Sequence, residues 1–146
     1  KEPISLDHSV FRYVNARGIY LPYLRGVALD ISGSDFERAN LFCSYLKKVV
    51  AVRTTFAYCD IAESDFRCGD LRYADFNRTN CWRTEFAQAD MRNIENLELA
   101  DKIGDAHYHK TKVDPKEKGI IEAAISRRNL FSLEKQTGSY QLTNPN

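Results

Sequence analysis

The stretch SDFRC GDLRY ADFNR, residues 64–78, repeats one pattern three times: a small residue, an aspartate, an apolar residue and two further, mostly polar residues. The same spacing continues on both sides of this stretch. Set in fives from residue 29, the chain reads LDISG, SDFER, ANLFC, SYLKK, VVAVR, TTFAY, CDIAE, SDFRC, GDLRY, ADFNR, TNCWR, TEFAQ, ADMRN. All thirteen third positions are apolar, and with 43% apolar residues in the chain this arises by chance with a probability on the order of 10⁻⁵.

The first and second positions are also restricted. The first is small throughout, apart from Leu29 and the larger Val49. The second is Asp or Asn at residues 30, 35, 40, 60, 65, 70, 75, 80 and 90. These two residue types tolerate tight turns and hydrogen-bond to nearby backbone groups, so a turn role is expected for them.

A period of five fits neither a helix nor a straight strand. Five helical steps leave successive apolar residues about 140° apart, and an odd period on a strand sends them to opposite faces. The chain must therefore turn a corner every five residues, with one large and one small side chain of each five pointing inward.

The pattern small–Asp/Asn–Leu/Phe–x–x, as in ADFNR and SDFRC, resembles that of the pentapeptide-repeat proteins over about residues 29–95. This resemblance implies an all-β solenoid, a right-handed quadrilateral β-helix with four fives per coil. Residues twenty apart then form four internal columns. Phe36, Phe56 and Phe76 share one column, and Leu46, Phe66 and Phe86 share another. The remaining columns are Leu41, Ile61 and Cys81, and Ile31, Ala51, Leu71 and Met91.

The two ends are less regular than residues 29–96. In residues 1–28 the register continues from about residue 10 with large residues in the small slot, which fits either a degenerate first coil or an N-terminal cap. Residues 97–113 are expected to form a connector. Asp114-Pro115-Lys116-Glu117 predicts a helix over 115–128 with a capping box, either capping the last coil or binding a partner. Residues 132–146 are expected to be loose.

The composition excludes several classes of function. The net charge of +1 over 146 residues gives no argument for nucleic-acid or membrane binding, and no apolar stretch is long enough to span a bilayer. Cys43, Cys59, Cys68 and Cys81 contain no C-x-x-C pair, so free thiols in a reducing compartment, the cytoplasm, are expected. The sequence begins at Lys1 without a methionine, as a processed form or an excerpt would.

No residue pattern indicates catalysis. His107 and His109 follow Asp105, but a metal site usually needs three or four converging ligands, and surface histidines are the simpler interpretation. The aspartates recur every five residues, whereas a catalytic pair is needed once. We therefore expect no enzyme, no catalytic residues, no cofactor and no metal.

The outward positions are more informative. Phe42 and Trp82 fall in one column, Tyr58 falls between Arg38 and Arg78, and Tyr73 neighbours Arg53 and Arg72. Exposed aromatic and arginine side chains are typical of interface hot spots, although ordinary surface decoration by arginine stems on rings is an equal alternative. These eight residues are the predicted protein-binding surface.

The sequence thus favours a non-catalytic scaffold that binds an unidentified protein through a face or an end of the solenoid. Some members of the family protect DNA gyrase by imitating duplex DNA, which requires a long acidic face. The four faces over residues 30–98 carry net charges of 0, −3, −1 and +1, which disfavours this alternative. A further alternative is an accessory subunit of a larger assembly. Either a monomer or an end-to-end dimer is compatible with the sequence.

Overall fold

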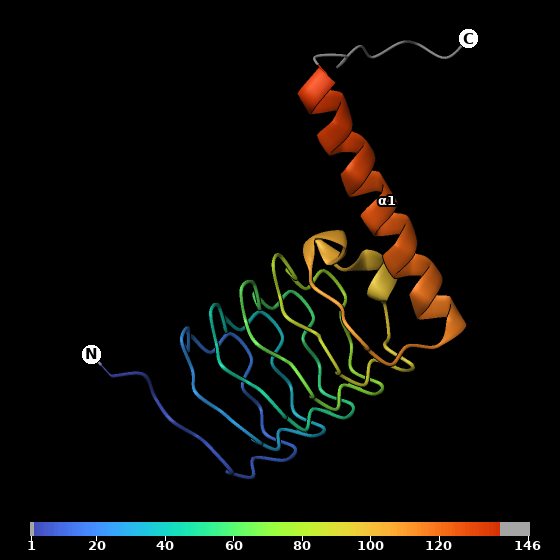
Figure 1. Ribbon diagram of the computed structural model, residues 1–146. Helices are drawn as coiled ribbons and strands as arrows, with labels where there is room; N and C mark the ends of the chain where they lie inside the picture. Colours follow the sequence, from blue (N-terminus) through green and yellow to red (C-terminus); the bar gives the residue numbers. More distant parts are fainter. Residues whose placement is uncertain (1, 138–146) are drawn as a thin grey trace.

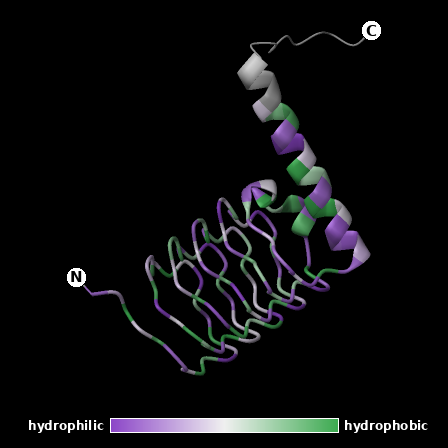
Figure 2. Cartoon of the chain, in the orientation of Figure 1, coloured by the Kyte–Doolittle hydropathy of each residue, from purple (hydrophilic) through white to green (hydrophobic). Residues whose placement is uncertain are grey.

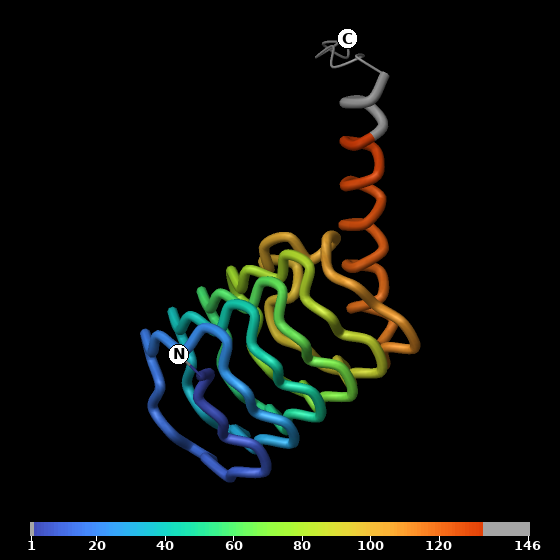
Figure 3. The backbone as a smooth tube through the Cα atoms, turned by 60° about the vertical axis from the view of Figure 1, so that its left-hand side comes forward, coloured from blue at the N-terminus to red at the C-terminus, as the bar shows by residue number. Residues whose placement is uncertain are grey.

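The chain forms a rod of stacked four-sided coils, with a helix, α1, at its C-terminal end (Figure 1). The computed structural model describes residues 2–137. Parallel bridges join residues twenty apart, from Ser5 with Arg25 to Asp75 with Glu95, at one position on each side of each coil. Each side is therefore too short for a continuous strand, and the bridges between coils act as the ladder. Figure 3 shows the coils following one another along the rod axis.

Each five-residue repeat ends in a turn. The N–H of the residue three after the central one returns to the central carbonyl, as in Ser34 N–H to the Ile31 carbonyl oxygen at 3.1 Å. The fifth residue of each five lies in the left-handed region, with φ of 62° at Arg38 and at Lys48. This is the requirement of a type II turn, here met mostly by residues other than glycine.

The second-position aspartates and asparagines support the turns. Their Oδ1 atoms accept the N–H two residues further on, as in Glu37 N–H to Asp35 (2.9 Å) and Asn77 N–H to Asp75 (2.9 Å). These residues therefore have the turn role expected from the sequence. Their side-chain oxygens accept hydrogen bonds from the backbone at the corners.

The predicted phenylalanine columns are confirmed. Ring centroids lie 6.2 Å apart for Phe36–Phe56, 5.8 Å for Phe56–Phe76 and 5.9 Å for Phe66–Phe86. Where the inner small residue is serine or threonine, its hydroxyl bonds to the preceding coil, as in Thr79 Oγ1 to the Phe56 carbonyl oxygen at 2.8 Å. Figure 2 shows hydrophobic and hydrophilic residues alternating at short intervals along the coils.

Exchanges of volume keep the core filled. Ala51 and Val49 are both fully buried, so the large residue in the small slot compensates for the small central one. At Gly26, a central position without a side chain, the large Leu29 in the next small slot fills the space, since a Cβ at Gly26 would lie 2.9 Å from Leu29 Cδ2. The same rule explains why Leu29 departs from the pattern.

The solenoid extends beyond both bounds of the 29–96 segment. Upstream, bridges begin at Ser5, so residues 5–28 lie in the coils. Downstream, residues 97–113 are the last part of the solenoid, where a separate connector was expected. Two short 3-10 helices there, η1 (Leu97–Leu99) and η2 (Ile103–Asp105), change the bridge spacing to 21 (Asn80–Asp101) and then 22 (Glu85–His107). Because each helix absorbs one extra residue, a strict period of five fails beyond residue 96.

Helix α1 spans Pro115–Thr137 and is longer than the predicted 115–128. Residues 129–137 hold no proline or glycine, and the leucine, glutamate, lysine and glutamine among them favour helix, so α1 continues past Arg128. Residues 132–137, expected in a loose tail, are helical, and the rest of that predicted tail, 138–146, lies outside the described residues. Ile121 and Ala124 are buried against the last coil, and the distal part of α1 projects away from the coils (Figure 1).

Contact with η2 fixes α1 on the solenoid. A Cβ at Gly104 would lie 2.5 Å from the Ala124 carbonyl oxygen, so the two backbones approach as closely as glycine permits. Arg128 donates to the Gly104 carbonyl oxygen at 2.8 Å. Within residues 2–137, no helix combines the length and the apolar character that a bilayer span requires.

Candidate protein-binding surface

Trp82 and Phe42 lie on one side of the solenoid, two coils apart. The backbone bonds Cys43 N–H to the Ala62 carbonyl oxygen (3.0 Å) and Glu63 N–H to the Trp82 carbonyl oxygen (2.8 Å) link the three coils of this column. Ala62 is buried between them, Trp82 is 40% exposed, and Phe42 is half-buried against the edge of the Tyr23 ring. This column therefore presents Trp82 as its most accessible large side chain.

Four arginines lie over aromatic rings, and the first is Arg25, whose guanidinium carbon is 5.4 Å from the centre of the Tyr45 ring. The guanidinium carbon of Arg38 is 4.6 Å from the centre of the Tyr58 ring, and that of Arg53 is 4.6 Å from Tyr73. Arg83, which the sequence did not single out, lies 5.4 Å from the Trp82 ring centre. The cation–π contacts hold these rings in fixed positions on the surface.

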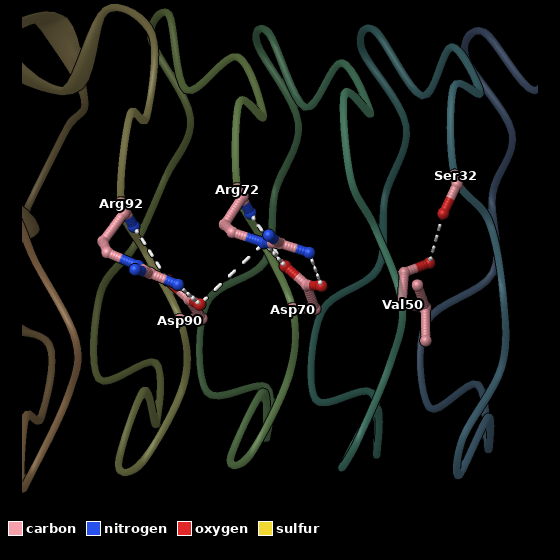
Figure 4. Close-up of polar contacts among 6 residues, drawn as sticks. All are labelled: Ser32, Val50, Asp70, Arg72, Asp90 and Arg92. Carbon is pink, nitrogen blue, oxygen red and sulfur yellow. Dashed lines mark hydrogen bonds and ion pairs between the residues drawn. The ribbon is translucent and has the colours of Figure 1, made fainter.

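The other two predicted arginines, Arg72 and Arg78, make no cation–π contact with a ring in the described part of the chain. Arg72 turns to Asp70 (2.8 Å) and reaches Asp90 at 3.9 Å, and Arg92 pairs with Asp90 at 2.7 Å (Figure 4). These contacts form a ladder of alternating charges along one side of the rod. In the same view, Ser32 donates to the Val50 carbonyl oxygen of the next coil at 3.5 Å (Figure 4).

Pairing with arginine lowers the pKa of Asp90 in this ladder and of Asp65, which lies outside it. The Arg92 guanidinium and N–H hold the pKa of Asp90 below its ordinary value, although burial acts in the opposite direction. For Asp65, burial is the largest effect and would raise the pKa, but hydrogen bonds from the Arg67 side chain and N–H outweigh it and lower the pKa. Both aspartates are therefore ionised and paired at neutral pH.

A groove of about 590 Å³ lies between the solenoid and α1, and Trp82 is one of its lining residues. The insertion at η2 forms one wall and α1 the other. Its charged lining residues are Lys102, Arg127, Arg128 and Asp105, so the groove is basic. Its remaining lining residues are Ala100, Ile103, Gly104, Ala124, Phe131 and Ser132. The sequence did not predict this groove, because its position depends on where α1 docks.

The histidines do not form a cluster with other ligands. His107 Nδ1 lies 2.6 Å from Glu85 Oε1 on the exposed surface. Among residues 2–137, no three His, Cys, Asp or Glu side chains are placed to hold a metal ion. The Glu85–His107 contact instead joins the last irregular coil to the regular one before it.

The thiols at Cys59 and Cys81 belong to the core. Burial raises the pKa of both thiols well above the ordinary value, so neither is a thiolate at neutral pH. Cys43 is half-buried, and burial raises its pKa as well.

Residues 56–93 match the family model for pentapeptide repeats in eight copies. This part of the chain is built of pentapeptide repeats. The pentapeptide-repeat region of the structure is wider than the matched residues, since the bridges run from Ser5 to Lys112. No curated protein sequence matches the chain.

Three solved pentapeptide-repeat structures resemble this one. A trypsin-treated form of QnrB1, a plasmid-mediated fluoroquinolone resistance protein, is 18% identical with a TM-score of 0.55, over 84% of this chain and 65% of that chain. Rfr23 from the cyanobacterium Cyanothece 51142 is 11% identical with a TM-score of 0.47, over 76% and 88%. HetL, involved in heterocyst differentiation regulation in the cyanobacterium Nostoc, is 15% identical with a TM-score of 0.40, over 61% and 41%. The chain thus spans just under two thirds of the QnrB1 chain, and the likeness concerns the fold alone.

Proposed function

We propose that this protein is a non-catalytic scaffold that binds another protein through the side of the solenoid bearing Phe42 and Trp82, and through the basic groove beside α1. The observation that carries this proposal is the position of Trp82. Its ring is 40% exposed, lies beside Arg83, and lines a groove on a rigid rod. Tryptophan and arginine together are the residues most enriched in binding hot spots.

The rigidity of the surface supports the same function. Each coil is tied to the next by backbone bonds on all four sides, so the surface side chains lose little backbone freedom when a partner binds. A preorganised surface avoids part of the ordering cost that reduces affinity. The excess of Lys102, Arg127 and Arg128 over Asp105 favours a partner with an acidic surface.

Imitation of duplex DNA is disfavoured by the paired aspartates. Asp30, Asp65, Asp70 and Asp90 each have an arginine partner between 2.6 and 2.8 Å away. A DNA mimic must instead present a long row of uncompensated negative charges. We expect purified protein at micromolar concentration to leave gyrase supercoiling unchanged, and inhibition or protection of the enzyme in that assay would favour the mimic.

Affinity purification from cells that produce the protein tests the proposed surface. Trp82→Ala and Arg127→Glu should each remove a partner recovered with the wild type, because they remove the anchor ring and reverse a groove charge. Tyr13→Ala, which removes an exposed ring on a different side of the solenoid, is the matched control and should retain the partner. Circular dichroism checks that the fold of each variant is intact. Equal recovery of the partner with Trp82→Ala and the wild type would contradict the proposal.

A further inference from the structure

Glu117, in the first turn of α1, has a buried carboxylate oxygen that lacks a hydrogen-bond partner within residues 2–137. The residue is only 4% exposed, and its Oε2 atom has no partner among the described residues. The capping box expected from the sequence is not formed. The Asp114 carboxylate instead accepts the Asn93 N–H at 3.1 Å and so ties the start of the helix to the solenoid. A buried and unpaired carboxylate is unfavourable unless a cation reaches it.

The Glu117 side chain forms part of the wall of a second groove, of about 470 Å³, between η1 and α1. We call this the η1 groove. Its charged lining residues are Glu95, Glu98, Glu117 and Lys116, so it carries an excess of negative charge. The η1 insertion contributes to it, since Asn96 and Glu98 line the groove and Asn96, with φ of 57°, precedes η1. Tyr73, Asn93, Ile94 and Asn96 complete the lining.

The protein's own cations are mostly engaged elsewhere. Lys118 faces Glu122 at 3.9 Å, and Arg72 and Arg92 pair with Asp70 and Asp90. Arg53 lies over the Tyr73 ring at 4.6 Å, at the edge of the groove. Lys116 is the remaining cation of the lining, and it is exposed and forms no ion pair within residues 2–137. The carboxylates of the groove are therefore not neutralised by a fixed partner.

The lining chemistry selects an organic cation over a metal ion. No group of three carboxylate, histidine or cysteine side chains within the described residues is close enough to hold a metal. Dispersed carboxylates, amide groups and an aromatic ring in an open groove instead suit a guanidinium or ammonium group, which is larger and donates several hydrogen bonds in different directions. We propose that the η1 groove binds an organic cation, either an arginine or lysine side chain of a protein or a free polyamine, with Glu117 as its buried counter-ion.

Titration of the ¹⁵N-labelled protein with an acetylated, amidated Gly-Arg-Gly peptide and, separately, with spermidine tests this site and its two sources of cation. Saturable amide shifts are expected at residues 93–98 and 116–118. The neutral peptide Gly-citrulline-Gly should cause none. Glu117→Gln should weaken the affinity of the tighter ligand about tenfold or more, because a charge-assisted hydrogen bond is lost. Lys116→Gln should strengthen it by removing the competing cation.

Glu122→Gln is the matched control, because Glu122 is an exposed carboxylate on the same helix that does not line the groove, and it should leave the affinity unchanged. Tighter binding of the peptide would identify a protein side chain as the ligand, and tighter binding of spermidine a free amine. The absence of localised shifts with both probes, equal binding of the citrulline peptide, or unchanged affinity in Glu117→Gln would overturn the site. These measurements are independent of the Trp82 surface, so either proposal can fail without the other.

Discussion

Phe56 is the residue whose loss we expect to cost the solenoid most. Its ring is fully buried and lies 5.8–6.2 Å from the rings of Phe36, Phe66 and Phe76. Phe56→Ala should lower the free energy of unfolding by about 3–5 kcal/mol, because it leaves a cavity that the fixed coils cannot close. Chemical denaturation measures this change. Arg78→Ala, at an exposed position, should change it by less than about 0.5 kcal/mol, and similar losses in the two variants would contradict the packing.

Asp65 gives the fold a pH dependence with a definite sign. Its pKa in the folded protein lies below the ordinary value of 3.8, so its pairing with Arg67 contributes stability above that pH and loses it as the pH falls through the folded pKa. The difference in unfolding free energy between wild type and Asp65→Asn should therefore be largest near neutral pH and shrink below about pH 4. A difference that stays constant between neutral pH and pH 3 would contradict this assignment. Glu63→Gln, at an exposed carboxylate, is the control.

The inner residues could be predicted from the sequence because one rule, large at the centre and small two before it, repeats often enough to be recognised. The left-handed backbone conformation at the fifth position could not be predicted from the sequence. Gly33 and Asn93 occupy it in two of the fives, but lysine, arginine, tyrosine and cysteine occupy most of the others, and none of these four residue types indicates positive φ. The sequence also did not predict the ion pairs. From its position in the repeat, Arg72 could contact either Tyr73 or Asp70, and in the structure it pairs with Asp70.

The turns are the elements in which backbone conformation limits the sequence. Lys48 has φ of 62° at the fifth position of its five. Lys48→Gly should leave the unfolding free energy unchanged or raise it by up to about 1 kcal/mol, because glycine adopts this conformation without strain but also gains entropy in the unfolded chain. Lys48→Ile should lower it, since a β-branched residue is disfavoured there. Thermal denaturation compares the two, and a more stable isoleucine variant would contradict the left-handed turn.

The docking of α1 depends on the glycine in η2. In Gly104→Ala the new Cβ would lie 2.5 Å from the Ala124 carbonyl oxygen, so the helix must move away. We expect a loss of about 1–3 kcal/mol and faster amide exchange at residues 117–128, with the coils around Phe56 unaffected. Hydrogen exchange resolves the two regions. Unchanged protection of the helix would show that the contact does not fix it.

The start of α1 and its apolar face could be predicted because proline, apolar spacing and an acidic first turn are local signals. The end of α1 and the positions of both grooves could not be predicted from the sequence. The predicted end at residue 128 was too early because residues 129–137 contain no proline or glycine, and the grooves depend on η1 and η2, each of which absorbs a single inserted residue. One signal was available: Ala106-His107-Tyr108 has a small residue two before an aromatic one, and Tyr108 indeed stacks on Phe86 at 5.8 Å.

At the scale of the whole molecule, the solenoid is a quasi-one-dimensional stack in which each coil contacts its neighbours. Surface residues twenty apart therefore form columns whose spacing is fixed by the backbone bonds between coils. Helix α1 ends the stack, with the basic groove at η2 on one part of its surface and the acidic η1 groove on another. A rod with fixed columns and two grooves of opposite charge is suited to recognition by shape and charge.

The twenty-residue coil is the geometry on which the surface and both grooves depend. Nuclear Overhauser effects between ring protons, in protein labelled on its phenylalanine rings, measure it directly. The structure predicts contacts from Phe36 to Phe56 and from Phe56 to Phe76, whose ring centres lie 6.2 and 5.8 Å apart. The absence of both contacts, or chemical shifts typical of solvent-exposed rings for these residues, would contradict the account.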